Sequence, residues 1–308
     1  MRLLQSEFLR AASRRIVPMV LVGGLIAIVI GLGIAAVNAD KPSAAQIAQA
    51  QVSYENNVAR CEQRVSRQQI PLGYDGDAQT FCEKTWGPGV DGFFLRDLDT
   101  ILQATATFVI LLGVLLGASL GGADWTSNTM QTLLTWEQRR VRVFLVRAFV
   151  IAVCVFVITV FLQVVFVGVD ALVATTRGST AFLPSAFWRS VFVTIGRVSL
   201  MATGLALIGY AVAMIGRSTV ASLGALFGYL ILFEAVIAGF RPTIQGNLLV
   251  RAAIVVITHQ PIIDAEHTFD YNNPVILLGV SRAWLVVGVY TLVVGALGIV
   301  IFRRRDVT

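Results

Sequence analysis

The residues able to carry chemistry in this 308-residue chain are few, and their spacing fits none of the common catalytic motifs. Neither an HExxH nor a GxSxG sequence is present, which argues against zinc-protease and serine-hydrolase chemistry. His259, Asp264 and His267 could ligate a metal, but a solvated loop explains them equally well. We therefore predict no catalytic residue and no metal site.

Lysine is also scarce, which excludes a familiar nucleotide site. Of 24 basic residues only Lys41 and Lys84 are lysines, and neither follows a glycine. A P-loop requires a Gly-Lys pair to hold phosphates. We expect no cofactor on this chain, so any ATP and Mg²⁺ that drive it must be bound by another polypeptide.

Two ionisable side chains, Arg197 and Glu234, interrupt long apolar segments. At 1.5 Å per helical residue they lie about 9 Å and about 7 Å outside the middle of their helices. Charges at such depth are costly and usually paired. We predict an ion pair between Arg197 and Glu234, with Gln163 nearby. Such a pair either locks two helices together or lines a substrate path.

The composition places these residues in a membrane protein. Hydrophobic residues make up 56% and charged residues 14%, with a mean hydropathy of +0.77, whereas soluble chains average about 45–50% and about 25%. Six segments could cross a bilayer core of about 30 Å as helices. They cover residues 16–37, 101–120, 143–169, 191–215, 220–240 and 283–302. The first exceeds the apolar run of a signal peptide, about 7–15 residues, so we expect it to be retained. The predicted fold is all-α, in a single transmembrane domain over 1–308.

Arginines beside the spans give the orientation. They cluster at residues 2–15, 139–147, 217 and 303–305. With six spans these clusters share one side, which is then cytoplasmic, as are both termini. The net charge of +6 is therefore mainly a topology signal with some attraction to membrane lipids, and we predict no nucleic-acid binding.

Two segments should lie outside. The loop at 38–100 predicts a helix over 43–67 with Ser43 as N-cap, then irregular structure over 71–92. Cys61 and Cys82, 21 positions apart, predict a disulfide there, typically contributing about 3 kcal/mol. The segment 241–282 contains an apolar stretch too short to span, which suits a re-entrant outer helix before the last span.

On the cytoplasmic side, residues 122–140 predict a short amphipathic helix between the second and third spans. Its apolar positions are Met130, Leu133 and Leu134, followed by Trp136 and Glu137. Such a helix either lies in the headgroup layer or inserts into a cytoplasmic partner.

In this segment the chain resembles the permease subunits of type-2, exporter-type ATP-binding-cassette (ABC) transporters. The matching positions are Ala123, Asp124, Thr129, Leu133, Leu134, Trp136, Arg139, Arg140 and Arg147. Asn128 replaces the family's usual glycine, and Glu137-Gln138 its frequent proline. The chain ends are also similar to the family, with an amphipathic interfacial helix at 1–15 and a basic stretch before Asp306.

The resemblance implies that residues 122–140 form a coupling helix that docks into a separate ATPase. The contacts would come from Asp124, Met130, Leu133, Leu134, Trp136, Glu137, Arg139 and Arg140. It further implies two permease chains, identical or homologous, with an ATPase dimer in a bacterial cell membrane; the arginine-rich usage resembles actinobacterial proteins. This chain would be no enzyme, but would move a substrate outward by alternating access. Alternatives are an ATP-independent carrier or channel and, less well supported, a membrane enzyme.

Overall fold

The structure is a computed structural model of residues 1–308. It describes residues 2–37, 41–67, 78–87, 89–90, 92–126, 129–130, 135, 139–237, 240, 246–263 and 276–304. The first helices are α1 (Arg2–Ser13), α2 (Ile16–Val37), α3 (Ala44–Arg67), α4 (Ala78–Thr85), the 3-10 turn η1 (Leu95–Asp97) and α5 (Leu98–Thr126). Then come α7 (Arg140–Arg177), α8 (Phe187–Gly216), α9 (Thr219–Tyr229), the π-helix η2 (Leu230–Ile237), α11 (Leu249–Thr258), the strands β1 (Ile262–Ile263) and β2 (Ile276–Leu278), and α12 (Val280–Arg304).

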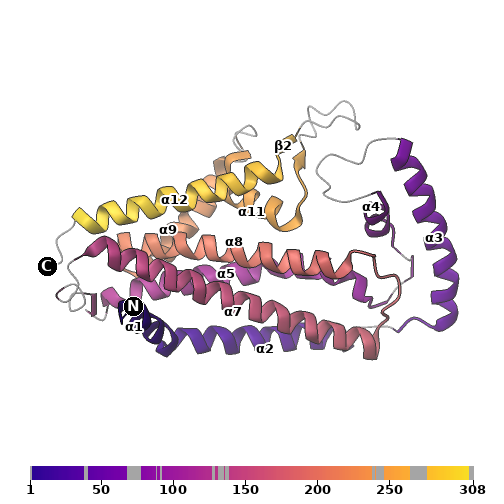
Figure 1. The fold of residues 1–308 in the computed structure, drawn as a ribbon, viewed down its shortest axis with the longest axis horizontal. Coiled ribbons are helices and arrows are strands. Elements are labelled where there is room, and N and C mark those ends of the chain that lie inside the picture. Colours follow the sequence, from indigo (N-terminus) through magenta and orange to yellow (C-terminus); the bar gives the residue numbers. More distant parts are fainter. Residues whose placement is uncertain are drawn as a thin grey trace.

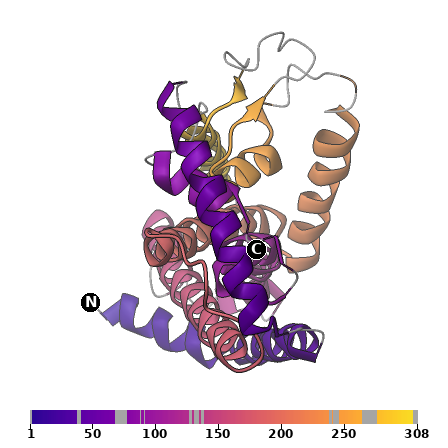
Figure 2. The same ribbon diagram turned by 90° about the vertical axis from the view of Figure 1, so that its right-hand side faces the viewer.

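Six helices within the described ranges are long and apolar enough to cross a membrane, which confirms the six predicted spans and a multi-pass membrane protein. The long helices run side by side, with α1 and the end of α12 at one end of the bundle (Figure 1). Helices α3 and α4 lie at the opposite end, where α3 crosses in front of the bundle in Figure 2. With 38 residues, α7 extends about 57 Å and so projects beyond a bilayer core.

Helix α8 occupies the centre of the bundle, packed against α5, α7, α11 and α12. Its contact with α5 depends on small residues, as is common between membrane helices. Gly113, Gly117 and Gly121 recur every four residues on one face of α5, and a Cβ at Gly117 would overlap the carbonyl oxygen of Ala206 on α8. These glycines set the close approach of the two helices.

Gly117→Val should therefore destabilise the bundle by about 1–3 kcal/mol, because the added atoms force α5 away from α8. The measurement is the Tm of the full chain purified in detergent. Gly168→Val on α7 is the matched control, since a Cβ there meets nothing within 4 Å. An equal Tm for the two variants would contradict the close α5–α8 packing.

The end of the molecule opposite α1 is built from helices joined by a disulfide. Ser43 and Gln46 cap α3 reciprocally, with the Gln46 amide 3.3 Å from Ser43 Oγ and the Ser43 amide 2.9 Å from Gln46 Oε1, which confirms the predicted helix start. Cys61 and Cys82 lie at disulfide-bonding distance, with Cα atoms 5.7 Å apart, as predicted. The disulfide joins α3 to α4.

Three features differ from the sequence predictions. The segment over 71–92, predicted irregular, contains α4, and residues 122–126 of the predicted coupling helix continue α5. The predicted fifth span changes from α-helix to π-helix at Leu230. The fold of the described residues is all-α as predicted, apart from the short strands β1 and β2, which pair antiparallel before α12. Within the segment predicted to be re-entrant, α11 packs against α8 and α12.

Candidate functional site

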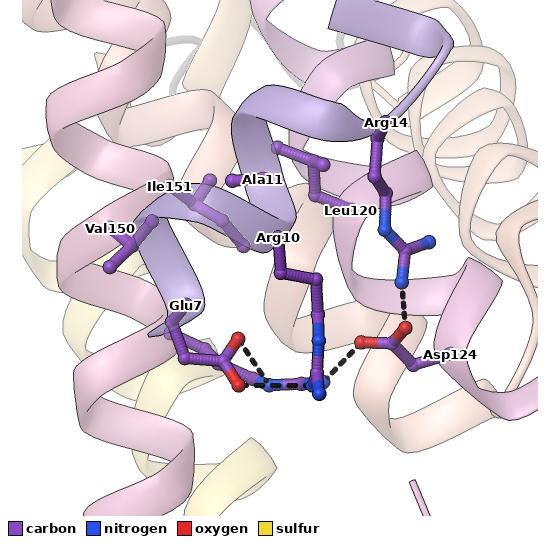
Figure 3. A pocket seen from close by; sticks show the side chains of 9 residues that line it. Glu7, Arg10, Ala11, Arg14, Leu120, Asp124, Val150 and Ile151 are labelled. Carbon is purple, nitrogen blue, oxygen red and sulfur yellow. Dashed lines mark hydrogen bonds and ion pairs between the residues drawn. The ribbon is translucent and has the colours of Figure 1, made fainter. Parts of the chain in front are cut away.

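A buried cluster of charges lies at the end of the bundle that holds α1. It forms where α1 meets the last turn of α5 and the first turns of α7 (Figure 3). Glu7, Arg10 and Ala11 share one face of α1 because they recur at i, i+3 and i+4, and Arg14 lies just after the end of this helix. Leu9, on another face, is 67% exposed. The charged face of α1 therefore points into the protein, whereas a surface helix normally points its charged face to the solvent.

Arg147 of α7 is the centre of the cluster. Its guanidinium Nε lies 3.1 Å from Glu7 Oε2, and its Nη1 lies 2.5 Å from Asp124 Oδ2. The exposed fractions of these three side chains are 4%, 7% and 3%. A planar guanidinium presents several donors in a fixed fork, so one arginine can hold two carboxylates at once. Arg147 thereby joins α1 to α5 through its own helix.

Two further arginines complete the cluster from α1 and its C-terminal end. Arg10 Nη1 donates to Glu7 Oε1 at 3.1 Å, and Arg14 forms an ion pair with Asp124 Oδ1. Burial lowers the pKa of the Arg14 guanidinium from its ordinary value, and the positive charges of Arg147 and Arg10 lower it further. An arginine remains protonated under such a shift. The five side chains form an alternating chain of three cations and two anions.

The same cluster touches the beginning of the predicted coupling segment. Thr129 Oγ1 donates to Asp124 Oδ1 at 3.1 Å, and Met130 is fully buried with its sulfur 3.5 Å from Arg147 Nη1. Arg139 is exposed just before α7, and Arg140 donates to the Arg303 carbonyl at 3.5 Å. The structure thus brings Asp124 and Met130 into one site. Leu133, Leu134, Trp136 and Glu137 lie outside the described residues.

The cluster is a joint between helices that is bordered by two cavities. The inner cavity measures about 20 Å³, close to the smallest space that holds one water molecule, whereas a wider, open cavity of about 520 Å³ is lined in part by Arg10, Arg14 and Asp124. The apolar wall of the inner cavity comes from Leu120, Val150 and Ile151 (Figure 3). A buried charge network of this kind resists separation, because removing one partner leaves the other charge uncompensated. It can transmit a displacement from one helix to another.

The sequence predicts Asp124 as a site residue but none of its partners. Glu7 is the first acidic residue of the chain and stands among Arg2, Arg10, Arg14 and Arg15. One carboxylate in such a setting was the available signal for a buried ion pair. Arg147 matches the ABC permease pattern in the sequence, but that match predicts no contact with Glu7 or Asp124.

A second polar cluster contains Glu234. Its Oε1 accepts hydrogen bonds from the Val250 amide at 2.7 Å and the Tyr229 hydroxyl at 3.2 Å. The Leu249 amide donates to the same hydroxyl at 3.2 Å, and Tyr290 lies 3.3 Å from it. Since Leu248 supplies no side-chain cap, Glu234 of η2 caps the N-terminus of α11 from a neighbouring element. The carboxylate therefore fixes α11 to η2.

The predicted pair of Arg197 and Glu234 stays a prediction. Gln163, expected near them, donates instead to Ser199 Oγ on α8 at 2.8 Å. Asp264 and His267 lie outside the described residues. Comparison with models of known protein families and with curated proteins gives no match, so any functional assignment rests on the residues and contacts of this chain.

Proposed function

We propose that this chain is the membrane-spanning permease subunit of a type-2 ABC transporter, driven by a separate ATPase. The sequence resemblance over residues 122–140 suggests the class. The observation that carries the proposal is the buried cluster of Glu7, Asp124 and Arg147, which ties the start of the coupling segment to α7 and α1.

In this proposal, closure of the ATPases around ATP and Mg²⁺ pushes on the coupling segment. Asp124 and Met130 both contact Arg147, so the push reaches α7 near its N-terminal end. Glu7 passes the same displacement to α1. The long helices then tilt together and open a path outward, and this chain supplies motion and binding surface without covalent chemistry.

The proposed assembly contains two permease chains, identical or homologous, in a cell membrane. Much apolar surface is available for lipid and for a second chain, since Phe227, Ile231 and Leu232 on α9 and η2 are each about 60% exposed. Export is the direction we propose, by alternating access between the two chains.

The test is recovery of an ATPase with the tagged, full-length chain purified from its own host. Reversing the charges of Arg139 and Arg140 to Glu, together with Trp136→Ala, should lower ATPase recovery about tenfold or more, because it removes the proposed docking contacts. The matched control is Arg177→Glu, Arg189→Glu and Trp188→Ala, which changes two arginines and an exposed tryptophan near the opposite end.

Unchanged ATPase recovery and activity with the first variant would refute the coupling assignment. No ATPase with the unsubstituted chain would favour the ATP-independent carrier. The Tm of each variant shows whether it is folded.

A further inference from the structure

The wider cavity beside the buried charge cluster, of about 520 Å³, lies where α1 meets α2 and the end of α5. Ile16 lines it and is the first residue of α2, one of the helices long and apolar enough to cross a membrane. The cavity therefore lies where the apolar core of the bilayer ends and the lipid headgroups begin. Its volume falls within the range of about 300–1,000 Å³ that is typical of ligand sites.

Positive charge dominates the lining of this cavity. Arg10, Arg14 and Arg15 line it together with a single acidic residue, Asp124, whose side chain is 3% exposed. Both carboxylate oxygens of Asp124 are already engaged, Oδ1 by Arg14 and Oδ2 by Arg147. When the buried cluster is included, four arginines meet two carboxylates, so positive charge remains in excess.

Several hydrogen-bond donors in the lining are available to an anion. Arg15 is exposed, and its guanidinium makes no ion pair or hydrogen bond within the described part of the chain. Arg10 is 38% exposed and binds Glu7 through Nη1 alone, although a guanidinium has five N–H donors. The partly buried Ser119 hydroxyl on α5 also has no partner among the described residues. The cavity thus offers donors from both of its walls.

The neighbouring cations favour the entry of an anion. Burial lowers the pKa of Arg14, and the positive charges of Arg147 and Arg10 lower it further. An anion in the cavity would offset this repulsion. Among anions, phosphate matches the fork of an arginine, because two parallel N–H groups can bind two of its oxygens.

The surface of α2 next to the cavity suits the acyl chains of a lipid. Met19, Ile26 and Ile30 lie on the same face of α2 as Ile16 and are 67%, 52% and 57% exposed. A lipid whose phosphate lies in the cavity can place its acyl chains along this face. A free phosphate ion has no such contact.

We propose that the cavity binds the phosphate of an anionic phospholipid, with Arg10 and Arg15 bound to the phosphate oxygens and Ser119 donating to one of them. Basic cavities between membrane helices are suited to such headgroups. A phosphocholine headgroup fits less well, because its ammonium group would meet the excess positive charge and Asp124 is already engaged. This site goes beyond the proposed transport function and requires no ATPase.

The test is native mass spectrometry of the full-length chain in detergent, titrated with dioleoyl phosphatidylglycerol and separately with dioleoyl phosphatidylcholine. The two lipids have the same acyl chains, and we expect the anionic one to bind about tenfold more tightly. Equal affinities would overturn the proposal. Inorganic phosphate in excess should not displace the bound lipid, because it makes no contact with α2. Complete displacement would show a site for free phosphate and overturn the assignment to a lipid.

Three substitutions separate the cavity from a general attraction to basic residues. Arg15→Gln should weaken phosphatidylglycerol binding about fivefold or more, and Ser119→Leu should abolish the preference by filling the cavity without changing any charge. Arg304→Gln, which removes one exposed arginine at the same end of the bundle (Figure 1), is the matched control and should change the affinity less than about twofold.

Equal losses for Arg15→Gln and Arg304→Gln would show diffuse attraction and overturn the site. Both side chains are exposed, so this comparison does not depend on a variant that disturbs the fold.

Discussion

Arg147→Ala is expected to lower the free energy of unfolding by about 3 kcal/mol, the lower end of the typical loss when one partner of a buried ion pair is removed, because Glu7 and Asp124 keep their contacts to Arg10 and Arg14. The substitution takes away the cation that Glu7 and Asp124 share, with both carboxylates left below 8% exposed. Arg147→Lys should give an intermediate loss, because an ammonium group lacks the fork that holds two carboxylates. The measurement is the Tm and the urea midpoint of the purified chain.

A variant that keeps the net charge of the cluster separates stability from pairing. Arg147→Met combined with Glu7→Gln removes one cation and one anion and leaves Asp124 paired with Arg14. This variant should recover at least half of the loss, since replacing a buried ion pair by neutral groups of similar size is often tolerated. Arg177→Ala, at the exposed far end of α7, is the matched control and should cost less than about 1 kcal/mol. If Arg147→Ala is as mild as Arg177→Ala, the cluster does not hold the helices together.

The six spans could be predicted because their signal is local. A run of apolar residues long enough to cross a bilayer needs no knowledge of its neighbours. The same holds for the start of α3, where Ser43 and Gln46 are three residues apart, and for the two cysteines of the outer loop. Helix α4 was missed because Gly and Pro residues on both sides conceal a helix of only eight residues.

The site could not be predicted in the same way, because its contacts join distant segments. Glu7, Asp124 and Arg147 come from three helices, and no sequence spacing relates them. Glu234 shows a second reason why the site could not be predicted. Its depth in the membrane predicts Arg197 as a partner, but a carboxylate can also accept hydrogen bonds from backbone amides at a helix N-terminus. Every residue except proline has a backbone amide, so the types of side chain in a sequence do not reveal which amides bind a carboxylate.

The position of the buried cluster determines which helices move together when one of them is displaced. Asp124 lies in the last turn of α5, and besides Arg147 it contacts Thr129 and Arg14, the latter at the junction of α1 and α2. A displacement of residues 124–130 therefore acts on α1, α5 and α7 together. Neutralising Glu7 should release α1 from Arg147, because Asp124 remains as a partner of Arg147. A Glu7 variant can therefore show whether the buried cluster transmits motion to α1 or only stabilises the fold.

Glu7→Gln should accordingly leave the bundle folded but uncouple it. In the complex with its proposed ATPase, ATP hydrolysis should continue, whereas the ATP-dependent change in hydrogen exchange of α2, α7 and the outer helices should fall about fivefold or more. Hydrogen exchange in α1 should rise, because Arg147 and Arg10 lose the charge that holds this helix.

The control is Glu55→Gln on the exposed face of α3, which removes the same charge at the far end of the molecule and should change neither quantity. If Glu7→Gln loosens α1 but the ATP-dependent exchange of α2 and α7 is retained, α1 is an anchor and the force travels through Asp124 and Arg147 alone. If hydrogen exchange in α1 does not rise, the contact of 3.1 Å between Arg147 Nε and Glu7 Oε2 does not hold α1 in place. The buried cluster would then join only α5 and α7.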